Sequence, residues 1–342
     1  MKKILVTGGA GFIGSNLIRM MLSEHEGYEV VNLDVLSYSG NLENLTGCEG
    51  DPRYSFIKGD VSEPDTAASA IEGCDAVLHL AAESHVDRSI TGPRPFVVAN
   101  TLGTQTLLEA WRQAQGGEGA PFVYISTDEV YGSLPLENPE VRFTEDSPIV
   151  PSSVYSASKA AGDHLAHAYH HTYGMDVRIT RCSNNFGPYQ FPEKVIPLFV
   201  TNLMEGRKVP LYGDGLNVRD WIHVDDHARG ILATLERGKA GEVYNLGSDN
   251  ERSNLELTHM ILDIMGTGKD MIEHVEDRLG HDRRYAIDSS KAQRELGWQA
   301  ERSAWPDGLE KTVQWYRDNE EWWRRVKSGA YREYYEKQYG VR

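Results

Sequence analysis

Two neighbouring carboxylic acids and a tyrosine–lysine pair are the residues of this sequence best suited to proton transfer. Asp128 and Glu129 follow an apolar run at residues 122–126. Adjacent carboxyl groups can hold different protonation states when burial and mutual repulsion separate their pKa values, giving one acid and one base. Tyr155 and Lys159 are four residues apart, so a helix places them on one face, where the ammonium favours the phenolate and lowers the tyrosine pKa. Such a tyrosine could remove a proton from an alcohol.

A glycine-rich turn near the N-terminus predicts a dinucleotide site. Gly8, Gly11 and Gly14 lie between an expected strand and an expected helix, and Asp34 follows Gly14 by 20 residues. Such a turn brings phosphates close to the backbone and to the free N–H groups of a helix N-terminus. Because a carboxylate at Asp34 accepts the ribose 2′-OH and repels a 2′-phosphate, NAD is favoured over NADP.

Each pattern also has a plainer interpretation. A tyrosine and a lysine at this spacing are usually an ordinary surface pair, and neighbouring acids are common in the loops of an acidic protein. Asp60 is a candidate for adenine contact, but a helix cap or turn role fits it equally well. The catalytic interpretation of Asp128 and Tyr155 depends on the dinucleotide pattern that precedes them.

Short apolar runs alternate with helical patterns in the first half of the chain, which predicts an α/β fold with a Rossmann-type doubly wound parallel sheet. After about residue 180 the sequence is richer in Asn, Pro, Gly and aromatic residues, which suits a ligand-facing loop. We therefore expect a first domain over residues 1–183 and a smaller mixed α/β domain over 184–342, with some segments returning to the first. The expected strands are Ile4–Thr7, Glu29–Leu33, Ala76–Ala81, Phe122–Ser126 and Val243–Leu246. The expected helices are Asn16–Ser23, Thr101–Gln115, Pro197–Glu205, Val224–Arg237, Asn254–Met265 and Leu309–Lys327.

Composition limits the partners. The 342 residues include 35 Lys and Arg against 51 Asp and Glu, a net charge of −16, which disfavours nucleic acid and membrane surfaces. An anionic ligand must therefore meet a local arginine cluster. Three separated cysteines and the lack of a long apolar stretch favour a cytoplasmic protein. The aromatic residues of the C-terminal region, from Trp315 to Tyr339, are expected to pack or to form an intersubunit contact.

The sequence resembles the dTDP-glucose 4,6-dehydratases, a group within the extended short-chain dehydrogenase/reductase family, from about Ile4 to Tyr316. The resemblance rests on the stretches TGGAGFIGS, LAAESHVDRS, STDEVYG, YSASKA, CSNNFGPYQFPEKVIP, LYGDGLNVRDWIHVDDHA, YNLGSDNERSN, GHDRRYAID and LEKTVQWY. In related 4-epimerases the position of the Asp128–Glu129 pair carries small or hydroxyl residues. Departures are Leu279, where proline is expected, and Val35, where lysine is frequent.

The resemblance implies an NAD-dependent hydro-lyase for a nucleotide diphosphate glucose. Tyr155, assisted by Lys159 and Thr127, would take the C4 hydroxyl proton while hydride passes to tightly bound NAD. Glu129 would then remove the C5 proton, protonated Asp128 would release the C6 hydroxyl as water, and the hydride would return to C6. Alternatives are a UDP- or CDP-glucose 4,6-dehydratase, a 4-epimerase, a decarboxylase or a non-catalytic NAD-binding regulator.

The resemblance also implies two sets of binding residues and a homodimer built from helices near 101–115 and 155–173. The expected cofactor contacts are Gly8, Gly11, Phe12, Ile13, Gly14, Asp34, Ser37, Asp60, Val61, Leu80, Ala81, Ala82, Ser84, Tyr155, Lys159 and Asn185. The expected substrate contacts are Ser84, Thr127, Asn184, Lys194, Val195, Pro210, Tyr212, Arg219, Asn254, His281 and Arg284, with Arg219 and then Arg284 as diphosphate ligands. No functional metal is expected, although His164, His167 and His171 share one helical face.

Overall fold

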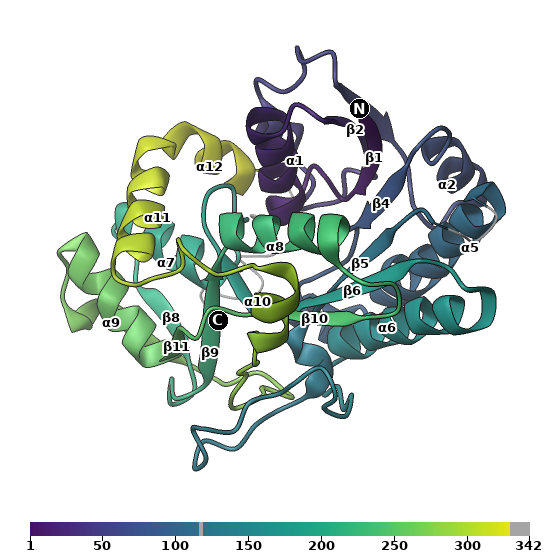
Figure 1. The fold of residues 1–342 in the computed structure, drawn as a ribbon. Coiled ribbons are helices and arrows are strands. Elements are labelled where there is room, and N and C mark those ends of the chain that lie inside the picture. Colours follow the sequence, from purple (N-terminus) through teal and green to yellow (C-terminus); the bar gives the residue numbers. More distant parts are fainter. Residues whose placement is uncertain (116–118, 329–342) are drawn as a thin grey trace.

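A seven-stranded parallel sheet forms the centre of the computed structural model, which describes residues 1–115 and 119–328 (Figure 1). The strands lie in the order β10, β6, β5, β4, β1, β2, β3, and every neighbouring pair is parallel. This arrangement confirms the predicted Rossmann-type fold. The strands are β1 (Lys2–Thr7), β2 (Tyr28–Asp34), β3 (Tyr54–Lys58), β4 (Ala76–His79), β5 (Phe122–Thr127), β6 (Val177–Cys182) and β10 (Val243–Leu246).

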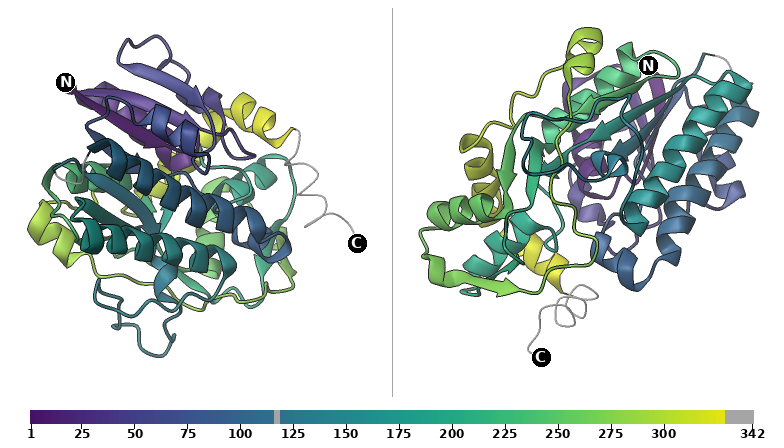
Figure 2. Two further views of the ribbon diagram at one scale, coloured as in Figure 1. Left: turned by 90° about the vertical axis from the view of Figure 1, so that its right-hand side faces the viewer. Right: turned by 90° about the horizontal axis from the view of Figure 1, so that it is seen from below.

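Helices cover both faces of this sheet, as Figures 1 and 2 show. Ile4 and Val6 of β1 pack in one apolar cluster with α1 and α8, whereas Leu5 packs in another with α2, α5 and α6. Because successive strand side chains point to opposite faces, a strand covered on both sides needs a continuous apolar run. The helices are α1 (Phe12–Glu24), α2 (Pro64–Ala70), α5 (Gly103–Gln115), α6 (Val154–Tyr173) and α8 (Val224–Arg237).

The second half of the chain builds a smaller lobe beside the carboxyl ends of the strands. Two of its elements belong to the larger lobe: β10 is an edge strand of the large sheet, and α8 packs against one face of that sheet. Its strands are β7 (Asn184–Phe186), β9 (Val218–His223) and β11 (Glu251–Ser253) in one sheet, and β8 (Val209–Tyr212) and β12 (Ile272–Val275) in another. Its helices are α7 (Val195–Met204), α9 (Asn254–Met265), α10 (Ser290–Leu296), α11 (Asp307–Asp318) and α12 (Glu320–Lys327). Short helical segments connect the elements: η1 (Leu42–Leu45), α3 (Val86–Thr91), α4 (Arg94–Phe96), the π-helix η2 (Val97–Leu102), η3 (Asp128–Tyr131) and η4 (Lys269–Met271).

Two local differences from the sequence prediction have physical reasons. The helix expected over Leu309–Lys327 is interrupted at Asn319, where the backbone leaves the helical conformation with φ −116° and ψ 40°. The side-chain amide and the backbone N–H of Asn319 both donate to the Trp315 carbonyl, at 2.8 and 3.0 Å. Strand β6 was missed because Arg178 and Arg181 break its apolar run. The buried Arg181 guanidinium forms an ion pair with Asp163, in which Nε lies 2.7 Å from Oδ2.

The tryptophans near the C-terminus pack inside the smaller lobe. Trp322 and Trp323 belong to an apolar cluster with α7 and α9, and the Trp322 indole donates to the Asn44 side chain at 3.0 Å. The tyrosines beyond residue 328 lie outside the described residues. Within residues 1–115 and 119–328, no helix combines the length and apolarity needed to cross a bilayer.

Candidate active site

The two candidate carboxylates stand where β5 ends at the carboxyl edge of the sheet. Thr127 is the last residue of β5, and its hydroxyl accepts a hydrogen bond from the Glu129 backbone N–H at 3.3 Å. This contact starts the short helical turn η3, which contains both Asp128 and Glu129. The strand therefore delivers both carboxyl groups to the edge where parallel α/β sheets bind their ligands.

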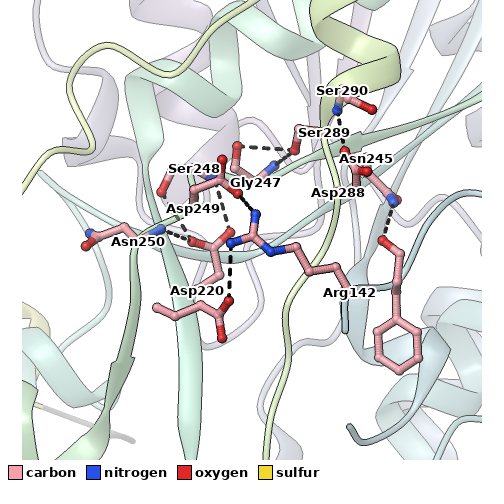
Figure 3. A network of polar contacts seen from close by, with 12 residues as sticks. Arg142, Asp220, Asn245, Gly247, Ser248, Asp249, Asn250, Asp288, Ser289 and Ser290 are labelled. Carbon is pink, nitrogen blue, oxygen red and sulfur yellow. Dashed lines mark hydrogen bonds and ion pairs between the residues drawn. The ribbon is translucent and has the colours of Figure 1, made fainter. Parts of the chain in front are cut away.

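Asp128 and Glu129 have different electrostatic surroundings. Burial and the neighbouring charges of Glu129 and Asp220 hold the pKa of Asp128 well above its ordinary value. Asp220, in β9, accepts backbone hydrogen bonds from Ser248 at 3.0 Å and Asn250 at 2.7 Å (Figure 3). One oxygen of Asp128, Oδ2, is buried without a protein hydrogen-bond partner. These surroundings favour the protonated form of Asp128, which could donate a proton.

Cations surround Glu129. Burial raises the pKa of Glu129, while Arg278, Arg219 and Lys194 oppose the rise because they favour the carboxylate. Among the neighbouring charges, negative groups therefore have the larger effect on Asp128, whereas positive groups have the larger effect on Glu129. This separation is what a site with one acid and one base requires.

Tyr155 and Lys159 both reach this edge from α6, but they do not form the pair expected from their spacing. The Lys159 ammonium donates to the Ile125 carbonyl at 2.8 Å and lies 4.2 Å from the centroid of the Tyr124 ring. Burial lowers the pKa of Lys159 to about 8. Burial and the charge of Glu129 raise the pKa of Tyr155 well above its ordinary value, although a hydrogen bond with Thr127 opposes this. The expected lowering of the Tyr155 pKa is therefore wrong for the protein without ligands.

The glycine turn has the geometry that a pyrophosphate needs. Gly8 has a φ of 73°, and a Cβ there would lie 2.8 Å from the Ala81 backbone; a Cβ at Gly14 would lie 2.3 Å from the Gly8 carbonyl oxygen. The cap residue of α1, Gly11, offers no side-chain hydrogen bond to the helix N-terminus. The first N–H groups of α1 are thus available to a phosphate.

Asp34 is fixed at the tip of β2. Its carboxylate accepts hydrogen bonds from the backbone N–H groups of Ala10 at 2.9 Å and Leu36 at 2.8 Å. The first of these contacts ties Asp34 to the glycine turn. This arrangement, together with the α1 N-terminus, fits the adenosine and pyrophosphate of NAD.

One cavity of about 460 Å³ joins these parts, which is within the range of roughly 300–1,000 Å³ usual for small-molecule sites. All the residues expected to bind the cofactor line it, as do the five candidate catalytic residues. Asp60 lines the cavity and also forms a turn, since it accepts hydrogen bonds from the backbone and hydroxyl of Ser62, both at 2.8 Å. Asn185 is oriented by a contact of 2.9 Å between its Oδ1 and Nδ1 of His227.

The cavity also contains part of the expected substrate site. Ser84, Asn184 and Lys194 line it, and the Lys194 ammonium donates to the Ser84 carbonyl at 3.0 Å. The Oδ1 atom of Asn184 is buried without a protein hydrogen-bond partner, so it remains available to a ligand.

The remaining substrate candidates come from the smaller lobe. The Tyr212 hydroxyl donates to Asp87 at 3.1 Å, and its ring lies edge-on to His281 with centroids 6.2 Å apart. Nδ1 of His281 lies 2.6 Å from the Asp277 carboxylate. Val195 begins α7, Pro210 lies in β8 and Asn254 begins α9.

Arg219 is buried beside the carboxylate pair. Its guanidinium donates to the Asp282 carbonyl at 2.9 Å and lies 4.2 Å from the centroid of the Tyr285 ring. Its charge lowers the pKa of both Asp128 and Glu129, which places it within electrostatic reach of the proposed chemistry.

Arg284 does not belong to this site, which corrects the sequence prediction. Its guanidinium is fully engaged: it donates to Glu251 at 2.8 and 3.1 Å and to the backbone carbonyls of Asn138, Pro139 and Val141. Only 2% of the residue is exposed. Arg284 therefore fastens the loop around residues 138–141 to β11 and has no donor left for a phosphate.

Arg278 is the cation that the sequence prediction missed. Among the neighbouring positive charges, Arg278 lowers the pKa of Glu129 the most. Its Nη1 lies 3.4 Å from the Asp87 carboxylate, and its Nε is buried without a hydrogen-bond partner. The signal was present, because Arg278 lies three residues before His281 in DRLGHDRR. The stretch contains three arginines, of which only Arg284 was expected to bind the diphosphate, and only the folded path of the segment separates them.

The histidines of α6 form no evident metal site. His167 and His171 stack with ring centroids 6.5 Å apart, while Nδ1 of His170 contacts the Met175 carbonyl at 2.7 Å. Across the part of the chain that the structure describes, no three His, Cys, Asp or Glu side chains gather as metal ligands would.

Comparisons with known proteins agree with this geometry. The family model described as GDP-mannose 4,6 dehydratase matches residues 5–311. The dTDP-glucose 4,6-dehydratase of Streptomyces niveus is 51% identical over 330 residues, covering 95% of this chain and 96% of the relative.

Two solved structures extend the agreement. The dTDP-glucose 4,6-dehydratase DesIV from Streptomyces venezuelae, with NAD and TYD bound, is 50% identical with a TM-score of 0.91, covering 95% of this chain and 100% of that one. The enzyme of the same description from Bacillus anthracis, in complex with NAD, is 47% identical with a TM-score of 0.88, covering 96% and 100%. The chain belongs to the GDP-mannose 4,6 dehydratase family and, within it, to the dTDP-glucose 4,6-dehydratases.

Proposed function

We propose that this protein converts dTDP-glucose to dTDP-4-keto-6-deoxyglucose with NAD as a recycled cofactor. The observation that carries the proposal is the position of Asp128 and Glu129 side by side in the cavity that also contains the glycine turn. Negative charge has the larger effect on Asp128, and the cations have the larger effect on Glu129. Water elimination needs an acid and a base at neighbouring carbons, and this pair supplies both. NAD, when bound, supplies a positively charged acceptor that takes a hydride and later returns it.

Tyr155 is the base for the sugar C4 hydroxyl in this proposal. In the protein without ligands, Tyr155 holds its proton because it is buried near Glu129. Nearby positive charge favours the phenolate, so Tyr155 becomes a base when the site is filled. The hydroxyl of Thr127 and the ammonium of Lys159 orient the phenol and the surrounding backbone.

The elimination step is assigned to the carboxylate pair. Oxidation at C4 makes the C5–H acidic, and Glu129 removes that proton as the carboxylate. Asp128 donates its proton to the C6 oxygen, the C6–O bond breaks, and the electron pair of the C5–H bond forms the C5–C6 double bond. Water leaves, and return of the hydride to C6 with a proton to C5 completes the reaction without net oxidation.

The diphosphate of the substrate requires cations inside an acidic protein. Arg219, Arg278 and Lys194 lie within electrostatic reach of Glu129. We assign the diphosphate to these cations, because a guanidinium can donate two parallel hydrogen bonds to a phosphate.

A direct assay tests the proposed activity. The purified protein should convert dTDP-glucose to a 4-keto-6-deoxy sugar that develops near-ultraviolet absorbance in alkali, whereas a 4-epimerase product would not. Parallel assays with UDP-glucose and CDP-glucose establish which pyrimidine is accepted. Formation of a dTDP-hexose without the keto band would contradict the proposal.

We also propose that the protein is a homodimer in which α5 and α6 pair with their copies. Val97, Leu102, Val154 and Tyr173 leave 38 to 50% of their surfaces exposed on or beside these helices, which suits an interface. Sedimentation at micromolar concentration tests this. A monomer would contradict it. The cytoplasmic location expected from the sequence stays a prediction.

A further inference from the structure

Three segments that are distant in the sequence meet at the wall of the cavity. Tyr38 lies in the loop that follows β2 and Asp34, while Glu193 lies just before α7 in the second half of the chain. Both side chains belong to residues that line the cavity. Arg88, from α3, lies between them and contacts both.

The contacts among these three residues are of several kinds. The Arg88 guanidinium carbon lies 3.7 Å from the centroid of the Tyr38 ring, a cation–π contact. Nε of Arg88 lies 3.6 Å from Oε2 of Glu193. The charge of Glu193 helps to raise the pKa of Tyr38, so these two side chains lie within electrostatic reach of each other and close a triangle of interactions.

Neighbouring residues support the triangle on both sides. Phe191 meets the Tyr38 ring edge-on with centroids 5.6 Å apart. Nε2 of His85 lies 3.8 Å from the same Glu193 oxygen that contacts Arg88. Glu193 is only 5% exposed, so its contacts are shielded from water, and burial raises the pKa of its carboxyl to about 7.

The position of the triangle links two walls of the cavity. Tyr38 belongs to the loop that continues directly from Asp34, on the side of the glycine turn. Glu193 precedes Lys194, whose ammonium donates to Ser84 on the side of the sugar site. The dinucleotide loop and the segment before α7 cannot separate without breaking the contacts of Arg88.

We propose that Tyr38, Arg88 and Glu193 form a clasp that slows the dissociation of NAD. The inference rests on the proposed function, in which one bound NAD molecule serves successive turnovers and need not be exchanged between them. The two cavity walls can part only when the Tyr38–Glu193 interaction and at least one contact of Arg88 break. The clasp therefore raises the barrier for release and adds no group that touches the reacting atoms. The three are positioning residues.

The test measures NAD dissociation directly. The holoprotein is diluted into buffer that contains a nucleotide-consuming enzyme, and the NAD remaining with the protein is followed over time. Tyr38→Ala should dissociate at least about tenfold faster than the unchanged protein, whereas Tyr38→Phe, which keeps the ring against Arg88, should show a smaller increase. Glu193→Gln should resemble Tyr38→Ala. Activity lost after dilution should return when saturating NAD is added.

A matched control breaks an ion pair away from the cavity. Lys291→Gln removes a contact of 2.7 Å with Glu242 and should leave the dissociation rate unchanged. If Tyr38→Ala unfolds, Arg88→Gln provides the same test, because it removes both the cation–π contact and the ion pair. Folded Glu193→Gln and Arg88→Gln proteins that release NAD at the unchanged rate would overturn the clasp. An unchanged protein that never retains NAD would overturn the proposed function instead.

Discussion

The dinucleotide half and the sugar half of the cavity are built by different means. On the dinucleotide side, backbone conformation does most of the positioning: Gly8 and Gly14 leave no room for side chains, and Asp34 is held by two backbone N–H groups. On the proposed sugar side, the charges of Arg219 and Arg278 reach Glu129 from two separate segments of the chain. A backbone site tolerates almost no added atoms, whereas a side-chain site is sensitive to charge and direction.

The largest expected effect lies at the junction of the two halves. Glu129→Gln should lower turnover of dTDP-glucose by about 10²- to 10⁴-fold, the range for loss of a general base. Oxidation at C4 should still occur, so reduced cofactor should accumulate and be visible by its absorbance. Full turnover by this variant would remove Glu129 from the role of base and would leave the charge asymmetry without a function.

A methyl group tests the dinucleotide side. Gly14→Ala places a Cβ 2.3 Å from the Gly8 carbonyl oxygen, so the turn must deform and NAD retention should be lost. Overpacking of this kind costs about 1–3 kcal/mol of stability. Gly27→Ala is the control, since nothing lies within 4 Å of a Cβ there. Normal NAD content in Gly14→Ala would show that the glycine turn can accommodate a side chain.

Two arginines of one short segment test the sugar side. Arg278→Gln should raise the KM for dTDP-glucose about tenfold or more and leave the melting temperature nearly unchanged, because it removes a ligand cation. Arg284→Gln should do the reverse, lowering stability by about 2–4 kcal/mol because Glu251 and three carbonyls lose their donor. The opposite result would exchange the binding and structural roles of the two residues.

The pH dependence gives the smallest and most specific effect. Glu129 must be charged, so activity rises as the pH increases through its pKa, which lies above the ordinary value. Asp128 must be protonated, and its pKa is held well above its ordinary value, so activity falls only when the pH exceeds that raised pKa. The rate of the elimination step against pH should be bell-shaped.

Asp128→Asn separates the two limbs of this profile. It should remove the alkaline limb, slow the loss of water and retain exchange of the C5 proton with solvent. Loss of exchange with retained dehydration would reverse the acid and base assignments.

Features that depend on a few consecutive residues could be predicted from the sequence. The parallel sheet followed from apolar runs separated by helical patterns, and the dinucleotide site followed from the glycine spacing and Asp34. These patterns reflect local requirements of the backbone, which are the same wherever the segment lies. The break at Asn319 and strand β6 were missed because one amide and two arginines altered otherwise regular patterns.

Features that depend on distant segments were decided by the tertiary structure. Sequence spacing put Lys159 beside Tyr155, but packing sends its ammonium to the Ile125 carbonyl. The sequence by itself determined the fold class, the dinucleotide turn and the neighbouring position of the two carboxyl groups, because each is encoded within a strand, a turn or a helix. Only the tertiary structure decided that the charge of Arg278 acts on Glu129, while Arg284 donates its hydrogen bonds to Glu251. The interaction energy of two charges depends on their distance in space and not on their separation in the sequence.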